Sequence, residues 1–375
     1  MRIIEDAVVP LECNRPAIEY MQKWWESRLG NTEQAVRYRR EERLKLASTL
    51  NNGSMYDIER EMKRYCGEII NMDIDLMIYA QSVLSGIFEI VPVEGNNIPS
   101  YTTWITPEIT VTRMSAHGVP PSQVKFMSAA QYFPSFYMLS TPRIYQPRSS
   151  ILTGETGPNE KINARARYEI AQALEDDMWT LLANSVGAFG SDVWAYDTRI
   201  QSVPSTNFYD FSEEGGLTKG LFQKILAAVD LIPSRTRPNE SARIRNIFVP
   251  HVAVKDIREW VSVVSNTVGA EATITPDLQR EIERRGPMIE SLWGETLGLR
   301  KVNRLMGTTP ADFGKFLWVF LDEPVGRLYL KTDEDRTDVL TDRIPYEIGY
   351  VISRVVAMEI PEPYKPNFML VQFAE

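Results

Sequence analysis

The segment from 160 to 187 is the longest amphipathic stretch of the chain, and it constrains the fold more than any other feature. Apolar residues recur along it at three- and four-residue spacing, which is typical of one face of an α-helix. Gly187 and Gly190 end the pattern. Such a helix is roughly 40 Å long at about 1.5 Å per residue, so its apolar face needs a broad surface, and a long sheet is the natural candidate. The stripe consists of Ile162, Ala166, Ile170, Ala173, Leu174, Leu181 and Leu182.

The sequence before this helix has the character of an extended excursion without a local core. Residues 98–152 are rich in Thr, Val, Ile, Tyr, Trp and Phe, which favour strands, and prolines interrupt them repeatedly. The motif HGVPPS at 117–122 is a strong turn signal between two extended runs. These features predict a long two-stranded ribbon that has nothing close in sequence to pack against.

The first quarter of the chain is helical and highly charged. Residues 16–29 predict an amphipathic helix that ends at Gly30 and Asn31. A second helix follows, and its run RYRREER interleaves acids with arginines, which favours a solvated helix face over a nucleic-acid arm. Residues 55–86 predict one more helical segment, which ends near Gly86.

The second half of the chain alternates helices and strands. Residues 221–231 predict an amphipathic helix, and the runs IRNIFVP, LRKVNRLM, GKFLWVFLDE and GRLYLKT predict strands. The C-terminal stretch from residue 343 predicts two more long strands with a proline-rich segment between them. The fold class expected from the whole pattern is α+β.

Charge and cysteine content limit the partners that the protein can attract and the compartment in which it is made. The net charge of −9 provides no overall positive field to attract nucleic acid or anionic lipid. The two cysteines, Cys13 and Cys66, lack CxxC spacing and predict reduced thiols. The N-terminus lacks the pattern of a signal peptide, and the apolar runs are too short to span a bilayer. We expect a soluble protein made in a cytoplasm.

Motifs of catalysis are missing from the sequence. It has two histidines, His117 and His251, and neither a phosphate-binding GxxxxGK[ST] loop nor a GxGxxG motif after a strand. The triplet Glu175, Asp176 and Asp177 does not predict a Mg²⁺ site, because consecutive helical residues point about 100° apart. A solvated or intersubunit face is the preferred interpretation of that triplet. We therefore predict no catalytic, cofactor or metal site, and no enzyme.

Three local sequences, taken in their order, resemble a known family. They are NIFVPHVAVKDIREWV (246–261), ESLWGETLGLRKVNRL (290–305) and FGKFLWVFLDEPVGRLYL (313–330). Together with the order of helical arm, ribbon, long helix and α/β lobe, they resemble the major capsid protein of tailed double-stranded DNA bacteriophages. That family has the Hong Kong phage-type capsid fold, which encapsulins share.

The resemblance implies four parts. These are an N-terminal helical arm at 1–95, an extended loop at 96–152, a peripheral domain at 153–217 and 331–375 with its spine helix at about 160–187, and an axial domain at 218–330. The ribbon then packs on a neighbouring subunit. The implied function is that of a structural subunit, which self-assembles into the hexamers and pentamers of an icosahedral head enclosing double-stranded DNA.

The resemblance also implies partners. We expect the chain to bind itself in capsomers, together with a separate scaffolding protein, a portal and an optional decoration protein, and to contact packaged DNA loosely and without sequence specificity. We expect no membrane partner, and localisation in the virion after assembly in the host bacterial cytoplasm. The short arm after Met1 predicts no maturation cleavage, and we expect non-covalent assembly even though Lys125 lies in the ribbon.

The predicted intersubunit contacts are large side chains of the ribbon and the arm, and ordinary core packing is the alternative for each aromatic one. They are Trp25, Trp104, Arg113, Phe126, Tyr132 and Phe136. Two alternative functions stay open: an encapsulin-like cellular compartment shell, and an α+β hydrolase with an unrecognised acidic site.

Overall fold

The structure is a computed structural model of the chain. It describes residues 11–28, 30, 32–54, 56, 57, 60, 61, 64, 75, 78, 82–94, 99, 101–105, 127–147, 157–188, 206–214, 216–232, 234, 240–250, 253, 288–290, 296–301, 315–340 and 347–373. The chain divides into two compact units, and each contains its own sheet. The first comprises 1–99, 134–181 and 326–359, and the second comprises 100–133, 182–325 and 360–375.

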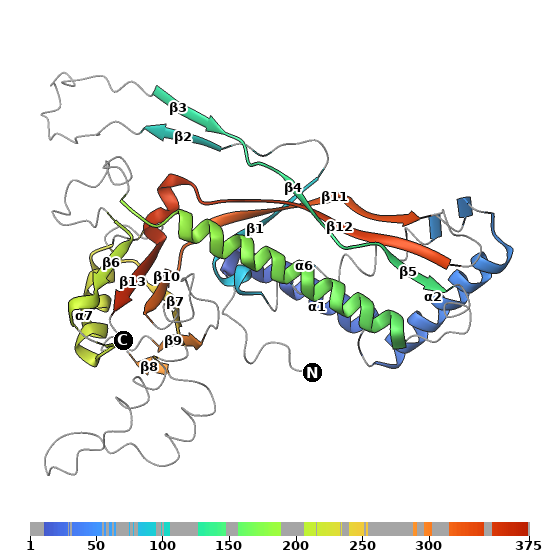
Figure 1. Ribbon diagram of the computed structural model, residues 1–375, viewed down its shortest axis with the longest axis horizontal. Coiled ribbons are helices and arrows are strands. Elements are labelled where there is room, and N and C mark those ends of the chain that lie inside the picture. The colour runs from blue at the N-terminus through green and yellow to red at the C-terminus, as the bar shows by residue number, and fades with distance from the viewer. Residues whose placement is uncertain are drawn as a thin grey trace, which may run out of the picture. The chain divides into compact units, whose positions relative to one another are not determined.

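The first unit is built on a five-stranded mixed sheet. Its strands are β1 (Phe88–Val93), β11 (Gly326–Leu340), β12 (Glu347–Glu359), β4 (Tyr137–Ser140) and β5 (Ile144–Pro147). β1 runs parallel to β11, whereas β11, β4 and β5 all pair antiparallel with β12. The two long central strands, β11 and β12, carry the sheet (Figure 1).

The long helix α6 (Gly157–Asn184) covers one face of this sheet. Figure 1 shows it running alongside β11 and β12. The prediction of a long helix here is confirmed, with both ends three residues earlier than expected. Gly187, which was expected to end it, has a φ of +147°, a value that favours glycine. The buried side chains recur every four residues, as a helix lying on a sheet requires: Ala166, Ile170, Leu174, Met178 and Leu182.

The N-terminal helices belong to the first unit as well. α1 (Arg15–Arg28) and α2 (Glu33–Asn52) are both confirmed as helices, and short 3₁₀ turns η1 (Glu12–Asn14) and η3 (Val83–Gly86) precede α1 and β1. Thr32 caps α2, because its side chain accepts a hydrogen bond from the Ala35 backbone N–H. A side chain at Gly30 would lie 2.8 Å from the Glu26 carbonyl oxygen, so glycine allows the tight turn between the helices.

The second unit contains a six-stranded sheet. The strand order is β6 (Phe208–Phe211), β13 (Phe368–Phe373), β10 (Phe316–Leu321), β7 (Ile244–Val249), β9 (Thr296–Lys301) and β8 (Met288–Glu290). Short 3₁₀ turns, η5 (Ser212–Glu214) and η6 (Glu362–Asn367), follow β6 and precede β13. The helix α7 (Lys219–Asp230) buries Leu221, Ile225 and Val229 in one core with Leu317 and Val319 of β10.

The opposite face of this sheet is aromatic. Trp318 stacks on Phe320 and Phe368 with ring centroids 6.0 and 5.9 Å apart, and Phe248 lies 5.0 Å from Phe320. All four side chains are fully buried. The continuous apolar run FLWVFL of β10 therefore fills a core on each face, which explains why it lacks the alternation of a half-exposed strand.

Part of the ribbon predicted between residues 98 and 152 is present as a separate two-stranded sheet, whereas β4 and β5, which fall in the same predicted ribbon, pair with β12 in the five-stranded sheet. β2 (Tyr101–Ile105) pairs antiparallel with β3 (Met127–Tyr132), with a register shift between Thr102 and Trp104. Among the strands that the structure describes, these two pair only with each other. The turn predicted at 117–122 lies outside the described residues.

The chain groups some segments differently from the four predicted parts. β13 was expected with the strands after residue 331, and β6 with the long helix, but both lie in the six-stranded sheet beside β10. Hydrophobic pattern alone identifies a strand and not its neighbours in a sheet, which explains the difference. β1, expected in the helical arm, and β4 and β5, expected in the extended loop, likewise lie in the five-stranded sheet with β11 and β12. The bounds of the four parts otherwise stay predictions.

Candidate assembly surfaces

Two of the predicted contact residues lie on the ribbon. Trp104 is in β2 opposite Ser128, and Tyr132 is in β3 opposite Tyr101. An isolated two-stranded hairpin is at best marginally stable in water, so a ribbon of this kind needs a further surface to pack on. Arg113 and Phe126 lie outside the described residues.

Phe136 already has a partner within its own chain. Its ring lies 6.4 Å from that of Tyr329 at an angle of 54°, and it packs on the cluster formed by Val93, Tyr329 and Ala357. Phe136 therefore packs on the five-stranded sheet of its own chain, which is the ordinary core packing named as the alternative for it.

Trp25 lies half-buried in α1, beside a contact that fixes the two leading helices. The Arg28 guanidinium lies 5.3 Å from the Trp24 ring centre and 5.0 Å from that of Tyr38, and it donates a 3.4 Å hydrogen bond to the Tyr38 hydroxyl. Such cation–π contacts contribute about 0.5–1 kcal/mol at exposed sites. Sequence reasoning missed this clamp, although the four-residue spacing of Trp24 and Arg28 is a visible signal.

The helical arm also carries a buried carboxylate. Glu42 of α2 is 4% exposed and accepts hydrogen bonds from Lys45 and Arg64, while Arg64 also pairs with Glu61. Burial raises the pKa of Glu42, but the bonds from Arg64 and Lys45 outweigh it and hold the pKa below its usual value. The network connects α2 to the helical segment that follows it.

A second polar site holds the start of the chain against β1. Asn14 is fully buried, and its side-chain amide donates to the carbonyls of Ser85 and Phe88 at 3.0 and 2.9 Å. Its oxygen accepts from the Ile90 N–H at 3.1 Å, and the Leu11 N–H donates to the Ser85 carbonyl. The chain from Leu11 onward is therefore fixed at one end of the sheet.

The acidic triplet of α6 connects the helix to elements on two sides. Glu175 accepts hydrogen bonds from the Ser82 hydroxyl and the Val83 N–H, both at 2.9 Å. Asp177 accepts one of 2.7 Å from the Tyr137 hydroxyl, and burial together with this carboxylate raises the pKa of Tyr137. The interpretation as a solvated or intersubunit face was wrong for Glu175 and Asp177, whose partners lie in their own chain. Glu175 and Asp177 bond to different elements, as expected for helical residues that point apart.

A buried ion pair lies on the α6 face of the sheet. Arg354 of β12 is opposite Leu139, which shares that face, and it is 1% exposed. One of its terminal nitrogens lies 2.5 Å from Asp75 Oδ1. Burial raises the pKa of Asp75, and the charge of Arg354 opposes this rise.

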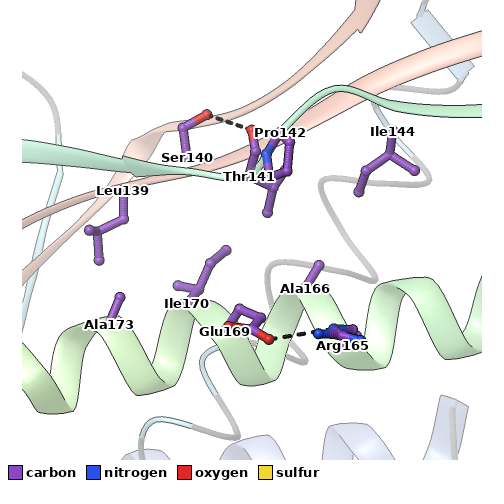
Figure 2. A pocket seen from close by; sticks show the side chains of 10 residues that line it. All are labelled: Leu139, Ser140, Thr141, Pro142, Ile144, Arg165, Ala166, Glu169, Ile170 and Ala173. Carbon is purple, nitrogen blue, oxygen red and sulfur yellow. Dashed lines mark hydrogen bonds and ion pairs between the residues drawn. The ribbon is translucent and has the colours of Figure 1, made fainter.

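A groove of about 320 Å³ runs between α6 and the edge of the sheet. Figure 2 shows Leu139 and Ile144 pointing from the strand side toward Ala166, Ile170 and Ala173 of α6. An exposed ion pair on α6, Arg165 with Glu169 at 3.4 Å, lies at its margin. The groove is thus apolar inside and charged at the rim.

Several large apolar side chains are exposed and could take part in contacts between subunits. Phe133, directly after β3, is 61% exposed, and Met138 of β4 is 59% exposed. The others are Tyr20, Val36, Leu44, Tyr56, Tyr168 and Leu231. Scattered apolar residues are normal on a surface, so their exposure alone does not mark an interface.

The described part of the chain has neither a metal-binding cluster nor a membrane-spanning helix. There, no group of three or more His, Cys, Asp or Glu side chains is arranged to hold a metal ion. No described helix combines the length and the apolar character that crossing a bilayer requires. His117 and His251 lie outside the described residues.

Comparison with known proteins gives similarity at the level of structure. No family model and no curated protein matches the sequence. Among solved structures, the chain is similar to one from the capsid of the cyanophage P-SCSP1u (TM-score 0.46, 9% identity, covering 76% of this chain and 85% of that chain). It is also similar to a chain of the mature capsid of bacteriophage PhiM1 (TM-score 0.47, 10% identity, 78% and 87%). A chain of Mycobacterium phage Patience is similar as well (TM-score 0.45, 12% identity, 88% of both chains).

Proposed function

We propose that this chain is a major capsid protein, a structural subunit that self-assembles into the hexamers and pentamers of an icosahedral phage head enclosing double-stranded DNA. The observation that carries the proposal is the β2–β3 ribbon, which pairs with no other described strand. A shell subunit needs elements that bury apolar surface against neighbours, and a ribbon that is marginal alone is suited to this. The order of helical arm, ribbon, long helix on a sheet, and α/β unit supports the same function.

In this proposal Trp104, Arg113, Phe126 and Tyr132 of the ribbon, together with Trp25 of the arm, contact adjacent subunits. The four capsid parts keep the bounds expected from the sequence, except that β6 and β13 join the axial sheet and that β1, β4 and β5 join the sheet of the peripheral domain. The partners are other copies of the chain, a separate scaffolding protein, a portal, a possible decoration protein and loosely held DNA. The acidic charge of the subunit is compatible with such weak contact to DNA.

Electron microscopy of the expressed protein, with and without co-expressed neighbouring genes of its source genome, tests the proposal. Closed particles built from hexamers and pentamers are the expected result, and DNA-filled particles in virions complete it. Particles that load a cellular protein and never DNA would instead indicate an encapsulin-like compartment. A monomer that stays single at high concentration, with carboxylates converging in a deep pocket, would overturn the proposal in favour of a hydrolase.

A further inference from the structure

The groove between α6 and the strand edge belongs to one compact unit of the chain. The residues that line it fall between 139 and 173, inside the segment 134–181 of the first unit. On the helix side, Ala166 and Ile170 are buried and apolar. Leu139 and Ile144 face them from the strand side (Figure 2). The unassembled subunit therefore carries this groove, whatever it assembles into.

The four polar side chains at the groove already have partners within the chain. The Ser140 hydroxyl donates to the Thr141 carbonyl at 3.2 Å, and the Thr141 hydroxyl accepts from the Ile352 N–H at 3.1 Å. Arg165 and Glu169 pair with each other at 3.4 Å, so the two charges at the margin cancel. A ligand with its own charge or strong polar group would give up its bonds to water for side chains that are already bonded. The groove therefore favours an uncharged, apolar ligand.

The volume of the groove limits the size of such a ligand. An apolar cavity of about 150 Å³ stays dry and binds benzene, because water inside it would lack the polar partners that it needs. The groove, at about 320 Å³, is roughly twice as large. A hydrocarbon that enters it gains free energy in proportion to the apolar surface that is removed from water. The space thus suits a molecule with about two aromatic rings, or an aliphatic one of similar size.

We propose that the groove is a binding site for a small, uncharged, apolar molecule of this size. Bound there, the molecule contacts α6 on one side and the strands β4 and β5 on the other. It therefore binds the folded first unit and not the unfolded chain, and it raises the melting temperature of the subunit by mass action. The inference goes beyond the proposed function and does not depend on it.

Two fluorescent probes that differ by one charged group test the site on the full-length, unassembled subunit. N-phenyl-1-naphthylamine is uncharged, whereas 8-anilinonaphthalene-1-sulfonate has the same rings and an added sulfonate. The uncharged probe should gain fluorescence at a single site and raise the melting temperature of the subunit. The sulfonate should bind about tenfold more weakly or not at all, because its charge would leave water without a new partner. Equal affinity of the two probes would overturn the proposal, and so would the absence of binding by the uncharged one.

Substitutions in the groove locate the bound probe. Ala173→Leu adds a side chain that fills part of the groove, and it should abolish the fluorescence gain of the uncharged probe. Gln172→Leu is the matched control, since it adds the same side chain about 100° away on α6 and should leave the gain unchanged. If Ala173→Leu does not fold, Ile144→Glu replaces it, because it places a carboxylate in the groove, and the exposed Arg143→Glu is its control. Binding that survives the groove variants would overturn the proposal.

Assembled particles distinguish this ligand from a second copy of the chain as the occupant of the groove. The uncharged probe should bind particles with the same affinity as the unassembled subunit. If particles exclude the probe, a neighbouring copy fills the groove, and the inference is overturned although the proposed function stands. If the chain forms no particles, the proposed function alone fails, because the measurements on the subunit do not need assembly.

Discussion

Arg354 and Asp75 form an ion pair inside the first unit, with the Arg354 terminal nitrogen 2.5 Å from Asp75 Oδ1. Breaking a buried pair by removing one partner leaves an uncompensated charge and costs about 3–5 kcal/mol. We predict that Asp75→Asn lowers the free energy of unfolding by about this amount in urea titrations of the unassembled subunit. The double variant Asp75→Leu, Arg354→Met should recover most of the loss. A double variant as unstable as the sum of the two single ones would contradict this account of the pair.

Glu175 connects α6 to the turn that precedes β1. Glu175→Ala removes the acceptor of two hydrogen bonds, and bonds to charged groups contribute about 1.5–3 kcal/mol each. We expect a loss of stability within the range of one to two such bonds, measured by thermal unfolding. Glu169→Ala is the matched control on the same helix, since its exposed pair with Arg165 contributes about 0.3–0.5 kcal/mol. Equal effects of the two variants would refute the role given to Glu175.

Glu42 makes the free energy of unfolding depend on pH. Its pKa is 4.5 in an ordinary environment and is lower in the folded chain, so the folded state binds fewer protons than the unfolded state as the pH falls below 4.5. The stabilising contribution of the carboxylate is thus complete above pH 4.5 and is lost as the pH falls through the lowered pKa. In Glu42→Gln, the free energy of unfolding should fall less steeply below pH 4.5 than in the parent.

Glu359 provides a control, because its pKa is shifted in the direction opposite to that of Glu42. Burial raises its pKa above 4.5, although Tyr329 and Arg327 oppose the rise. Just above pH 4.5, the Glu359 carboxyl is therefore protonated more often in the folded chain than in the unfolded chain. The contribution of Glu359 to the free energy of unfolding decreases as the pH rises through this range. Glu359→Gln should remove that decrease. If both glutamine variants changed the pH dependence in the same direction, the assignment of the two carboxylates would be wrong.

Gly326 begins β11 at a point where no side chain fits. A Cβ there would lie 2.5 Å from the Glu359 carbonyl oxygen and 2.6 Å from Phe88 Cε1. Gly326→Ala should destabilise the subunit by about 1–3 kcal/mol, as overpacked cores do. Gly220→Ala, in the first turn of α7, has open space and should be neutral or stabilising by up to about 1 kcal/mol. Chemical denaturation of both variants checks the contrast.

Trp104 and Phe136 should differ in what their loss affects. Trp104→Ala removes a ribbon side chain that is proposed to contact a neighbour, so particle yield should fall while the melting temperature of the unassembled subunit stays the same. Phe136→Ala removes a ring that packs on Tyr329, so the unassembled subunit itself should become less stable. Light scattering during assembly and calorimetry of the subunit measure the two effects. A less stable Trp104→Ala subunit would place that side chain in the chain's own core.

The sequence was sufficient to predict elements with a strong local pattern. The α6 stripe was predicted from its period, and among the α6 side chains that the structure describes as buried only Ala171 and Met178 were missed. Met178 directly follows the acidic triplet 175–177, which obscured the pattern there. The ribbon was predicted from its strand formers and its turn motif. These features depend on neighbours in sequence, so local propensity determines them.

Long-range relationships were beyond such reasoning. The parallel pairing of β1 with β11 joins residues more than two hundred positions apart, as in Glu89 with Arg327. Asp75 and Glu175 look like any acids on a helix, and only the fold gives them Arg354 and Ser82 as partners. β13 reads as a strand, but its place beside β10 depends on the topology of the whole chain.

The interleaving of the two units has a consequence for synthesis on the ribosome. The first sheet takes β1 from before residue 94 but β11 and β12 from residues 326–359. While the nascent chain emerges, the apolar surfaces of β1 and α6 stay uncovered until β11 and β12, near the end of the chain, have been translated. Newly made subunits are therefore exposed to misassociation during most of translation, and a chaperone that shields these surfaces would raise the yield of chains that reach the native state.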